Sequence, residues 1–406
     1  MTKTAKNTYF SYFIFLLYLI YEMRGVIYGE GTFLSKSMVV VVISYGIYCM
    51  FANMDNFVNQ KLPKIHIIFI FIISLYWIIS PAEVNGTVGE AIGKRPTWDF
   101  LKCFLYANVS FYTFYNMGKK TNIGYRTLII WVISLAVLKW CSMIIKREQI
   151  IYEALYDMKG VQMAAGYVFT GLIIYTLLIK EKTYRLIACT ILLICVVFSA
   201  KRGSIILGCL LYVWVIFESF VRGERRIKLK TILLGVIVLI FVGYGVVEYI
   251  SQDEFLMIRL EKTLEGDASH REEMYPLMMG IVNNSDIVDL IFGRGMIQSV
   301  NLIGNYAHND WFETIIDFGI ISFGVLLLFF VRLFHFCKTA DSSFKTMLYM
   351  TFIYLLFKSL VSMGIYSLES YMQFALIRFF YSKKQAEKSS YLCQESSSEN
   401  QNLHRP

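Results

Sequence analysis

The feature that most constrains this chain is a series of twelve apolar runs, each about as long as a membrane-spanning helix. They centre on 9–21, 34–52, 65–80, 99–117, 127–145, 163–179, 186–200, 203–221, 231–250, 311–331, 345–363 and 368–381. Only 17% of the 406 residues are charged, whereas soluble proteins average about 25%. This pattern excludes soluble enzymes, nucleic-acid-binding proteins and disulfide scaffolds. It predicts an all-α, polytopic integral membrane protein with about 12 transmembrane helices.

The basic residues predict the orientation of these spans. With the N-terminus in the cytoplasm, about 22 Lys and Arg fall inside and about 11 outside, as the positive-inside rule requires. Both termini are then cytoplasmic. Residues 1–250 carry helices 1–9, 251–310 form a large loop outside the membrane, 311–381 carry helices 10–12, and 382–406 form a polar tail that we expect to be disordered.

The 251–310 loop is unusually long, because loops beyond about 15 residues in compact architectures are functional or disordered. It contains a run of large side chains, Tyr275, Leu277, Met278, Met279 and Ile281. These side chains provide apolar surface for packing. We therefore expect the loop to be ordered, to contain helices of its own and to be functional.

The first motif is Lys201-Arg202-Gly203, two cations between two apolar runs at the predicted outer boundary. Cations placed this deep either snorkel to the interface or bind an anion. Snorkelling satisfies Lys as well as Arg, whereas the planar fork of Arg202 beside a small glycine suits close contact with a phosphate. Both interpretations stay open from these residues alone.

Two further motifs lie in the large loop. His270-Arg271, preceded by Arg259, forms a charged stretch that is either a solvated surface or an anion site. The segment from Gly293 to Gly295 precedes His308-Asn309-Asp310, which leads into the next predicted span. Asn309 or Asp310 is suited to cap that helix, and His308 is suited to proton transfer.

Several signatures of other enzyme classes are missing from the sequence. The predicted outer segments contain no DxD motif, and the chain has no HExxH, GxSxG or P-loop pattern. We therefore expect no metal site and no cofactor.

The three motifs, in this order, resemble the bacterial O-antigen ligase and polymerase superfamily over about residues 190–330. The family's Ser-Arg-Gly motif falls on Lys201-Arg202-Gly203, with Lys in place of the usual Ser. Its loop arginine falls on Arg271, its Gly-x-Gly on Gly293-Arg294-Gly295 and its His-Asn on His308-Asn309. The first half of the chain matches this family only in hydropathy.

The resemblance implies a multi-pass enzyme of the bacterial cytoplasmic (inner) membrane, with a fold like that of the lipid-linked-sugar glycosyltransferases (GT-C-like) and its active site on the outer face. Its substrate would be an undecaprenyl-diphosphate-linked oligosaccharide, used without a metal. Arg202 and Arg271 would stabilise negative charge on the diphosphate leaving group, and His308 would be the general base for a sugar hydroxyl. Further expected residues are Lys201, Arg259, Arg294 and Arg147 for the diphosphate, Asn309 and Asp310 as orienters, His270 as a second base, and Gly203, Gly293 and Gly295 as structural glycines.

Three functions remain open. The first is an oligosaccharide repeat unit polymerase of O-antigen, capsule or exopolysaccharide, which transfers the growing glycan onto the next lipid-linked unit. The second is a ligase that moves finished polysaccharide onto a lipid A core or another terminal acceptor. The third is a transporter of lipid-linked oligosaccharide, which charges within the spans would serve. A chain-length regulator, a flippase and membrane lipid are the expected partners, and nucleic acid is not.

Overall fold

The computed structural model describes residues 32–80, 97–120, 125–145, 165–199, 201–221, 271–304, 306–367 and 369–382, together with 16–21 and the isolated residues 10, 13, 14, 244 and 248. Within these ranges the regular secondary structure is helical, joined by turns and bends, and no residue lies in a β-strand. The predicted all-α class is therefore confirmed for the part of the chain that the structure describes.

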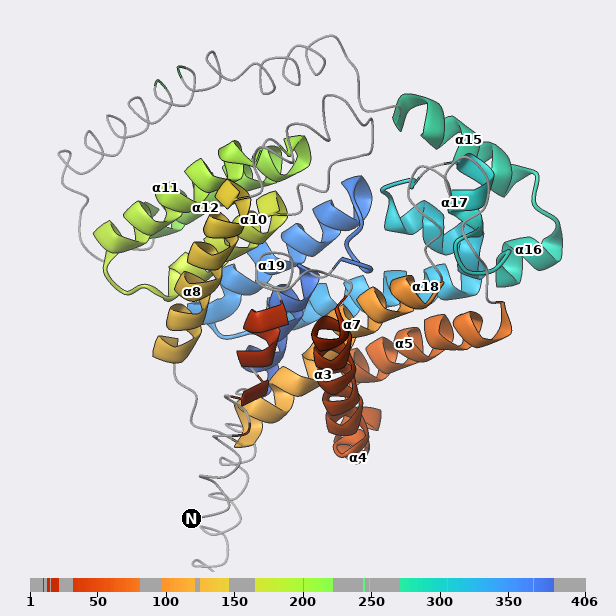
Figure 1. Cartoon of the computed structure of the whole chain (residues 1–406), viewed down its shortest axis with the longest axis horizontal. Helices are drawn as coiled ribbons and strands as arrows, with labels where there is room; N and C mark the ends of the chain where they lie inside the picture. The colour runs from red at the N-terminus through yellow and green to blue at the C-terminus, as the bar shows by residue number, and fades with distance from the viewer. Residues whose placement is uncertain are drawn as a thin grey trace, which may run out of the picture.

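The helices follow the apolar runs closely. They are α3 (Phe33–Phe51), α4 (Met54–Val58), α5 (Lys61–Ile79), α7 (Thr97–Lys120), α8 (Tyr125–Ile145), α10 (Ala165–Tyr175) with the 3₁₀ turn η1 (Thr176–Leu178), α11 (Lys182–Phe198), α12 (Arg202–Val221), α15 (Arg271–Asn283), α16 (Ile287–Phe292), α17 (Gln298–Ile303), α18 (Asp310–Thr339), α19 (Ser342–Val361) and a last helix over 370–382. Figure 1 shows their arrangement.

Five of the described helices are long and apolar enough to cross a membrane, namely Phe33–Phe51, Lys61–Ile79, Arg202–Ser219, Asp310–Thr339 and Phe344–Val361. Two shorter apolar helices, Ile129–Ile145 and Ala165–Leu178, accompany them. The total of twelve spans stays a prediction. Its ninth run, 231–250, falls outside the described residues except at two positions, and the 383–406 part of the predicted tail also falls outside them.

Large apolar side chains cover the outside of the bundle as well as its core. Ile133, Val213 and Val331, from three different helices, are each more than half exposed. A helix that is apolar all round needs an apolar surrounding, which a bilayer provides.

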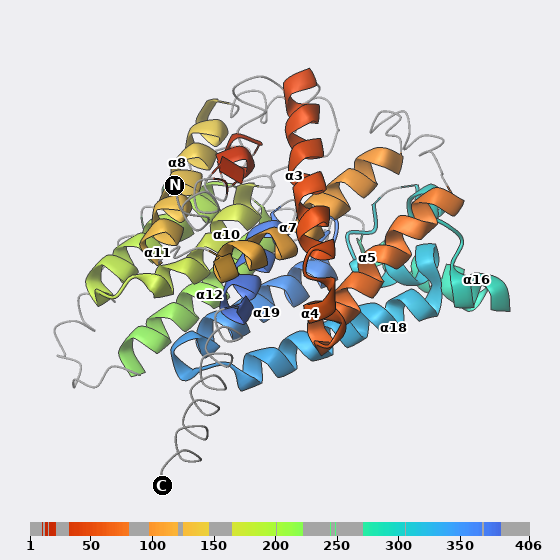
Figure 2. The same cartoon turned by 90° about the horizontal axis from the view of Figure 1, so that it is seen from below.

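Four of the long helices, α5, α12, α18 and α19, run in alternating directions between the same two ends of the bundle. Figure 2 shows α5 and α18 side by side, with α16 at one end of the pair. At that end α5 and α19 finish and α12 and α18 begin, and we call it the loop end. At the opposite end, the Thr346 hydroxyl near the start of α19 donates to Glu218 Oε1 near the end of α12 over 3.0 Å. Basic residues gather there, at the starts of α5, α11 and α19 and the end of α18: Lys61, Lys64, Lys182, Arg185, Lys338 and Lys345.

A kink in α18 gives the loop end its shape. Gly319 has φ 74° and ψ 177°, which interrupts the helix after its first turns. The break frees two carbonyl groups that an unbroken helix would use internally. Arg294 N donates to Ile316 O over 2.9 Å and Gly295 N donates to Asp317 O over 3.0 Å. The Gly-x-Gly segment is thereby bonded to α18 through its backbone.

Candidate functional site

The first predicted motif lies against the end of α19. Arg202 is the first residue of α12, and Gly203 follows it at a close approach of two other helices. A Cβ atom at Gly203 would overlap the hydroxyl of Tyr167 on α10 and would lie 3.7 Å from Val361 Cγ2 on α19. The expectation that Gly203 is a structural glycine therefore has a steric basis. Lys201 and Arg202 are both partly exposed at this position.

The second motif reaches the same place through α15, which begins at Arg271. One turn further along, the hydroxyl of Tyr275 donates to Leu360 O in α19 over 3.4 Å. Met274 and Met278 bury the other face of α15 against Ala307 and Ile316. We expected the large apolar side chains of this helix to pack. This prediction is wrong for Leu277 and Met279, which are both about half exposed.

The third motif enters the same region from the start of α18. Trp311 Nε1 donates to Ser359 Oγ over 2.9 Å. Asp310 is fully buried, and its Oδ2 accepts from Gly364 N over 2.7 Å and from Ile365 N over 2.8 Å. All three motifs therefore converge on residues 359–367, which we call the 359–367 segment.

His308 and Asn309 have different local tasks at the start of α18. The Asn309 side-chain oxygen accepts from Trp311 N over 3.0 Å and from Phe312 N over 3.2 Å, so Asn309 caps the helix, as one of the two interpretations predicted. His308 is half-buried and has φ 53°, a left-handed conformation that a non-glycine residue seldom adopts. Asn309 and Asp310 both accept hydrogen bonds from backbone amides. Their expected role as orienters of the His308 ring stays a prediction.

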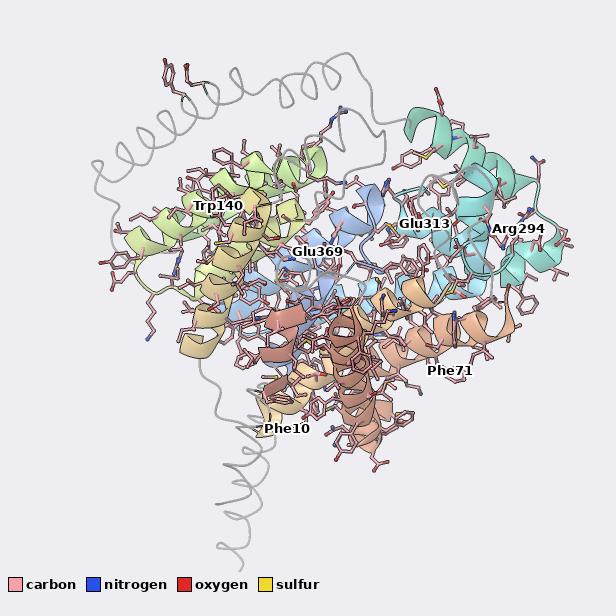
Figure 3. All side chains as sticks on the ribbon, viewed as in Figure 1. Phe10, Phe71, Trp140, Arg294, Glu313 and Glu369 are labelled. Atoms are coloured by element: carbon pink, nitrogen blue, oxygen red, sulfur yellow. The ribbon has the colours of Figure 1, made fainter. Side chains whose placement is uncertain are left out.

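A buried ion pair lies beside these motifs. Lys358 Nζ is 3.0 Å from Glu369 Oε2, and the Lys358 side chain is almost fully buried. The same ammonium group lies 5.0 Å from the centre of the Tyr167 ring, the residue that abuts Gly203. Glu369 lies in the interior of the bundle, whereas Arg294 lies near its edge (Figure 3).

Arg294 is held away from the 359–367 segment. Its guanidinium forms an ion pair with Asp289 over 3.2 Å and donates to Ser285 Oγ over 3.3 Å. The two glycines around it serve packing. Gly293 has φ 78° and lies against the backbone of α18, and a Cβ at Gly295 would overlap Ser80 at the end of α5. The backbone of this motif is thus bonded to α18, whereas the side chain of Arg294 binds Asp289 and Ser285.

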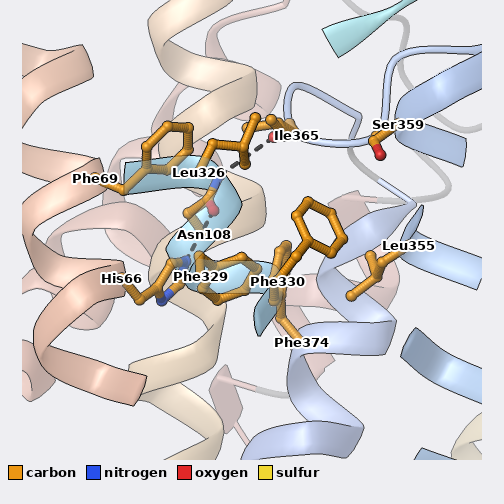
Figure 4. A pocket seen from close by; sticks show the side chains of 11 residues that line it. His66, Phe69, Asn108, Leu326, Phe329, Phe330, Leu355, Ser359, Ile365 and Phe374 are labelled. Atoms are coloured by element: carbon orange, nitrogen blue, oxygen red, sulfur yellow. Dashed lines mark hydrogen bonds between the residues drawn. The ribbon is translucent and has the colours of Figure 1, made fainter. Parts of the chain in front are cut away.

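A chain of buried hydrogen bonds connects the site to the middle of the bundle (Figure 4). His66 on α5 and Asn108 on α7 are joined over 2.9 Å, from Nε2 to Oδ1. The amide nitrogen of Asn108 donates to Ile365 O over 3.2 Å. Ile365 N in turn donates to Asp310. The 359–367 segment is therefore bonded to α7 through the carbonyl group of Ile365 and to α18 through its amide group.

Replacing Asn108 is expected to loosen this anchorage. Asn108→Leu keeps the approximate volume but leaves buried polar atoms of His66 and Ile365 without their partner, at a cost of about 1 to 3 kcal/mol for each. Thermal unfolding followed with a thiol-reactive dye measures this loss, because Cys49, Cys189 and Cys337 are buried. Asn116→Leu on the same helix is the control, since the Asn116 amide donates only to the Tyr45 hydroxyl among the hydrogen bonds described. Equal losses for the two variants would contradict the anchoring role.

Several predicted residues cannot be compared with this geometry. Arg147, Arg259 and His270 lie outside the described residues, and only the backbone of Arg271 is described.

Other residues of the site were not predicted. Glu313 and Asp317 are buried on α18, and Lys358 and Glu369 are paired, although the sequence suggested only that charges in the spans line a pathway. The spacing of Asp310, Glu313 and Asp317, three and four residues apart in an apolar run, was the available signal.

The fold and the site together define a multi-pass helical membrane protein with a polar site at the loop end of its bundle. Among the residues that the structure describes, no group of three or more His, Cys, Asp or Glu side chains could hold a metal ion. No model of a known protein family matches the chain, and no curated protein matches it either.

Proposed function

We propose that this protein is an oligosaccharide repeat unit polymerase that transfers a growing glycan from undecaprenyl diphosphate to the next lipid-linked unit. The observation that carries the proposal is the convergence of the Arg202, Tyr275 and His308 regions on the 359–367 segment. These regions are far apart in the sequence. Because they meet at one end of a membrane bundle, these regions would form a single site for a lipid-linked substrate.

The chemistry of the proposed transfer fits these residues. The anomeric bond of the donor sugar breaks as the acceptor hydroxyl attacks, and undecaprenyl diphosphate leaves with the bonding electron pair. Arg202 stands at the N-terminus of α12, where backbone N–H groups and the helix dipole also favour an anion. The arginine and the helix end together would stabilise the charge that develops on the diphosphate.

His308 would accept the proton of the attacking hydroxyl. A sugar hydroxyl is a weak nucleophile, and imidazole is the side chain whose ordinary pKa best suits a general base at neutral pH. The partial exposure of His308 is compatible with contact to a substrate that approaches from the loop end. No metal takes part in the proposed reaction.

The basic residues at the opposite end of the bundle support the proposed orientation. Lys61, Arg185, Lys338 and Lys345 would face the cytoplasm under the positive-inside rule. The loop end then faces outward, on the side of the bacterial cytoplasmic membrane where lipid-linked units are joined. The fold class that the resemblance implies, GT-C-like with about 12 spans, belongs to the same proposal.

A transporter of lipid-linked sugars is less well supported. Of the buried charges suited to a transport path, Lys358 is paired with Glu369. The guanidinium of Arg378 lies within 4.8 Å of the ring centres of Phe57, Phe111, Tyr115 and Tyr381. Neither arrangement leaves the charge open to a passing solute. A ligase shares the donor chemistry and stays the second candidate.

The direct test is a reconstituted reaction. Purified protein in lipid nanodiscs is given an undecaprenyl-diphosphate-linked repeat unit, and products are separated by length on a gel. We expect a ladder of longer glycans and release of undecaprenyl diphosphate, at a rate that EDTA leaves unchanged. Arg202→Ala protein prepared in the same way should be about 10²- to 10³-fold slower, the usual effect of removing one donor to a developing charge.

Other results would contradict a polymerase. Transfer only to an added lipid A core would identify a ligase. Movement of the lipid-linked unit across a vesicle membrane without bond formation would identify a transporter. A rate that falls with EDTA would overturn the metal-independent chemistry.

A further inference from the structure

The helix α16 is a short apolar element of the segment that precedes α18. Five of its six residues are apolar, and none of the six is buried among the residues that the structure describes. Ile287, Val288 and Phe292 are 76%, 64% and 54% exposed. Together with Ile291 they have the spacing i, i+1, i+4 and i+5, so they share one face of the helix. We call these four residues the α16 face.

The other side of α16 is polar. Asp289 lies 3.2 Å from Arg294 Nε, and the Arg294 guanidinium also donates to Ser285 Oγ over 3.3 Å. Asp286 caps the helix, because its side chain accepts from Asp289 N over 2.7 Å. An apolar face opposite a polar side is the arrangement of helices that lie in a membrane interface.

Backbone contacts fix α16 against the end of α5 and the kink of α18. The Tyr76 hydroxyl on α5 donates to Phe292 O and lies 3.4 Å from Phe318 O. A Cβ at Gly319 would overlap the carbonyl oxygen of Ile291, so the two backbones are in close contact there. Figure 2 shows α16 beside α5 and α18, at the edge of the molecule. The depth of these two attachments in a bilayer therefore gives the depth of α16.

The length of α5 places the first attachment at the boundary of the hydrocarbon layer. This helix has 19 residues, Lys61–Ile79, and spans about 28 Å at a rise of about 1.5 Å per residue. The hydrocarbon core of a bilayer is about 30 Å thick, so α5 reaches just from one boundary to the other. Any tilt of α5 would bring its ends deeper. Because Tyr76 lies within the last turn of α5, it attaches α16 at or just below this boundary.

The second attachment gives the same depth. From Ile320, directly after the kink, to Thr339, α18 has about 20 residues and also spans about 30 Å. Ile320 is half exposed, and Ile79 at the end of α5 is more than half exposed. Both helices therefore present apolar side chains at the level where α16 is attached. The α16 face continues the apolar surface that the bundle presents to the bilayer.

We propose that α16 is inserted into the membrane without crossing it, with its α16 face among the phospholipid acyl chains of the leaflet at the loop end. Burial of apolar surface is favourable in proportion to its area, and exposed apolar patches mark sites of interaction. Part of the segment predicted to be a loop outside the membrane would then lie in it. This inference does not depend on the proposed function.

The test is photo-crosslinking of the full-length protein in nanodiscs of phosphatidylcholine. Benzoylphenylalanine, introduced by amber suppression, replaces Val288 or Phe292 on the α16 face in separate variants. The same group in place of Ile321, a half-exposed residue of α18, gives the lipid-facing reference. Asn284 is the matched control, because it is exposed and lies three residues before α16 in the same segment. Mass spectrometry of the digested protein identifies what each position has bound.

We expect phosphatidylcholine adducts at positions 288 and 292, with yields close to that at position 321 and several-fold above that at position 284. The benzophenone group is itself apolar, and its presence at position 284 corrects for this. Val288 and Phe292 are both exposed, so either variant decides the result if the other does not fold.

Three outcomes would overturn the inference. Yields at positions 288 and 292 no higher than at position 284, with adducts still formed at position 321, would place the α16 face in water. Crosslinks to other peptides of the same chain would show that a protein segment covers this face. Crosslinks confined to a dimer band would identify a second copy of the chain as the partner in place of lipid.

Discussion

His308→Ala is expected to lower the rate of chain elongation by about 10²- to 10⁴-fold, the usual contribution of a positioned general base. The substitution removes the imidazole and leaves the cap of α18 in place, because that cap is made by the Asn309 side chain. Alanine and histidine both carry a Cβ atom, so the steric cost of the left-handed backbone at position 308 is similar for the two residues. The loss should therefore appear in kcat, with the protein folded and the lipid-linked donor still bound.

The pH dependence gives a second measure of the same group. A histidine base must be neutral to accept a proton, so the native rate should rise with pH as the imidazole loses its proton and then level off. His308→Ala should lack this rise. His335→Ala is the matched control, because His335 lies on the same helix near its opposite end and is exposed. Equal loss in both variants, or an unchanged pH profile in His308→Ala, would exclude His308 as the base.

Much of the helical frame was predictable because hydropathy depends on the local sequence. The apolar runs 34–52 and 203–221 correspond to α3 and α12 within a residue or two at each end. The run 311–331 was too short, since α18 continues to Thr339. The eight additional residues include Arg332, His335 and Lys338, polar side chains that break a hydropathy window but do not break a helix.

The site was less predictable, because its geometry depends on contacts between distant segments. The motifs identified Arg202 and His308, but nothing local to them indicated that both would lie near the end of α19. Asn108 and the partner it binds, Ile365, are 257 positions apart in the chain. A motif predicts the residue types of a site, whereas these supporting contacts are made only by the tertiary structure.

The glycines also show that the local sequence does not identify every structurally required residue. Gly293 and Gly295 were recognised from their spacing, but Gly319 was not, because nothing in the apolar run around it distinguishes it from Gly324. The structure separates the two. Gly319 has a positive φ and lies against Ile291 and Gly293, whereas a Cβ at Gly324 would meet nothing within 4 Å.

Gly319→Ala is therefore expected to cost more than about 4 kcal/mol and to abolish a folded, monodisperse preparation, the range seen when a core backbone contact is disrupted. The φ and ψ angles of Gly319 fall in a region that is essentially restricted to glycine. A Cβ there would also overlap the carbonyl oxygen of Ile291, which is backbone and cannot turn aside. Straightening α18 to relieve the overlap would reclaim the carbonyls that bond Arg294 and Gly295.

Gly324→Ala makes the same change five residues further along the same helix and is the control. It should be neutral or stabilising by up to about 1 kcal/mol, because alanine is favoured over glycine in a helix interior. Expression, size-exclusion profile and dye-monitored unfolding measure both variants. If Gly319→Ala were well folded, with the same unfolding temperature as the native protein, the kink would not be needed to hold the Gly293–Gly295 segment. A large loss in Gly324→Ala would mean that another part of the protein covers Gly324, which would contradict the open space around its Cβ position.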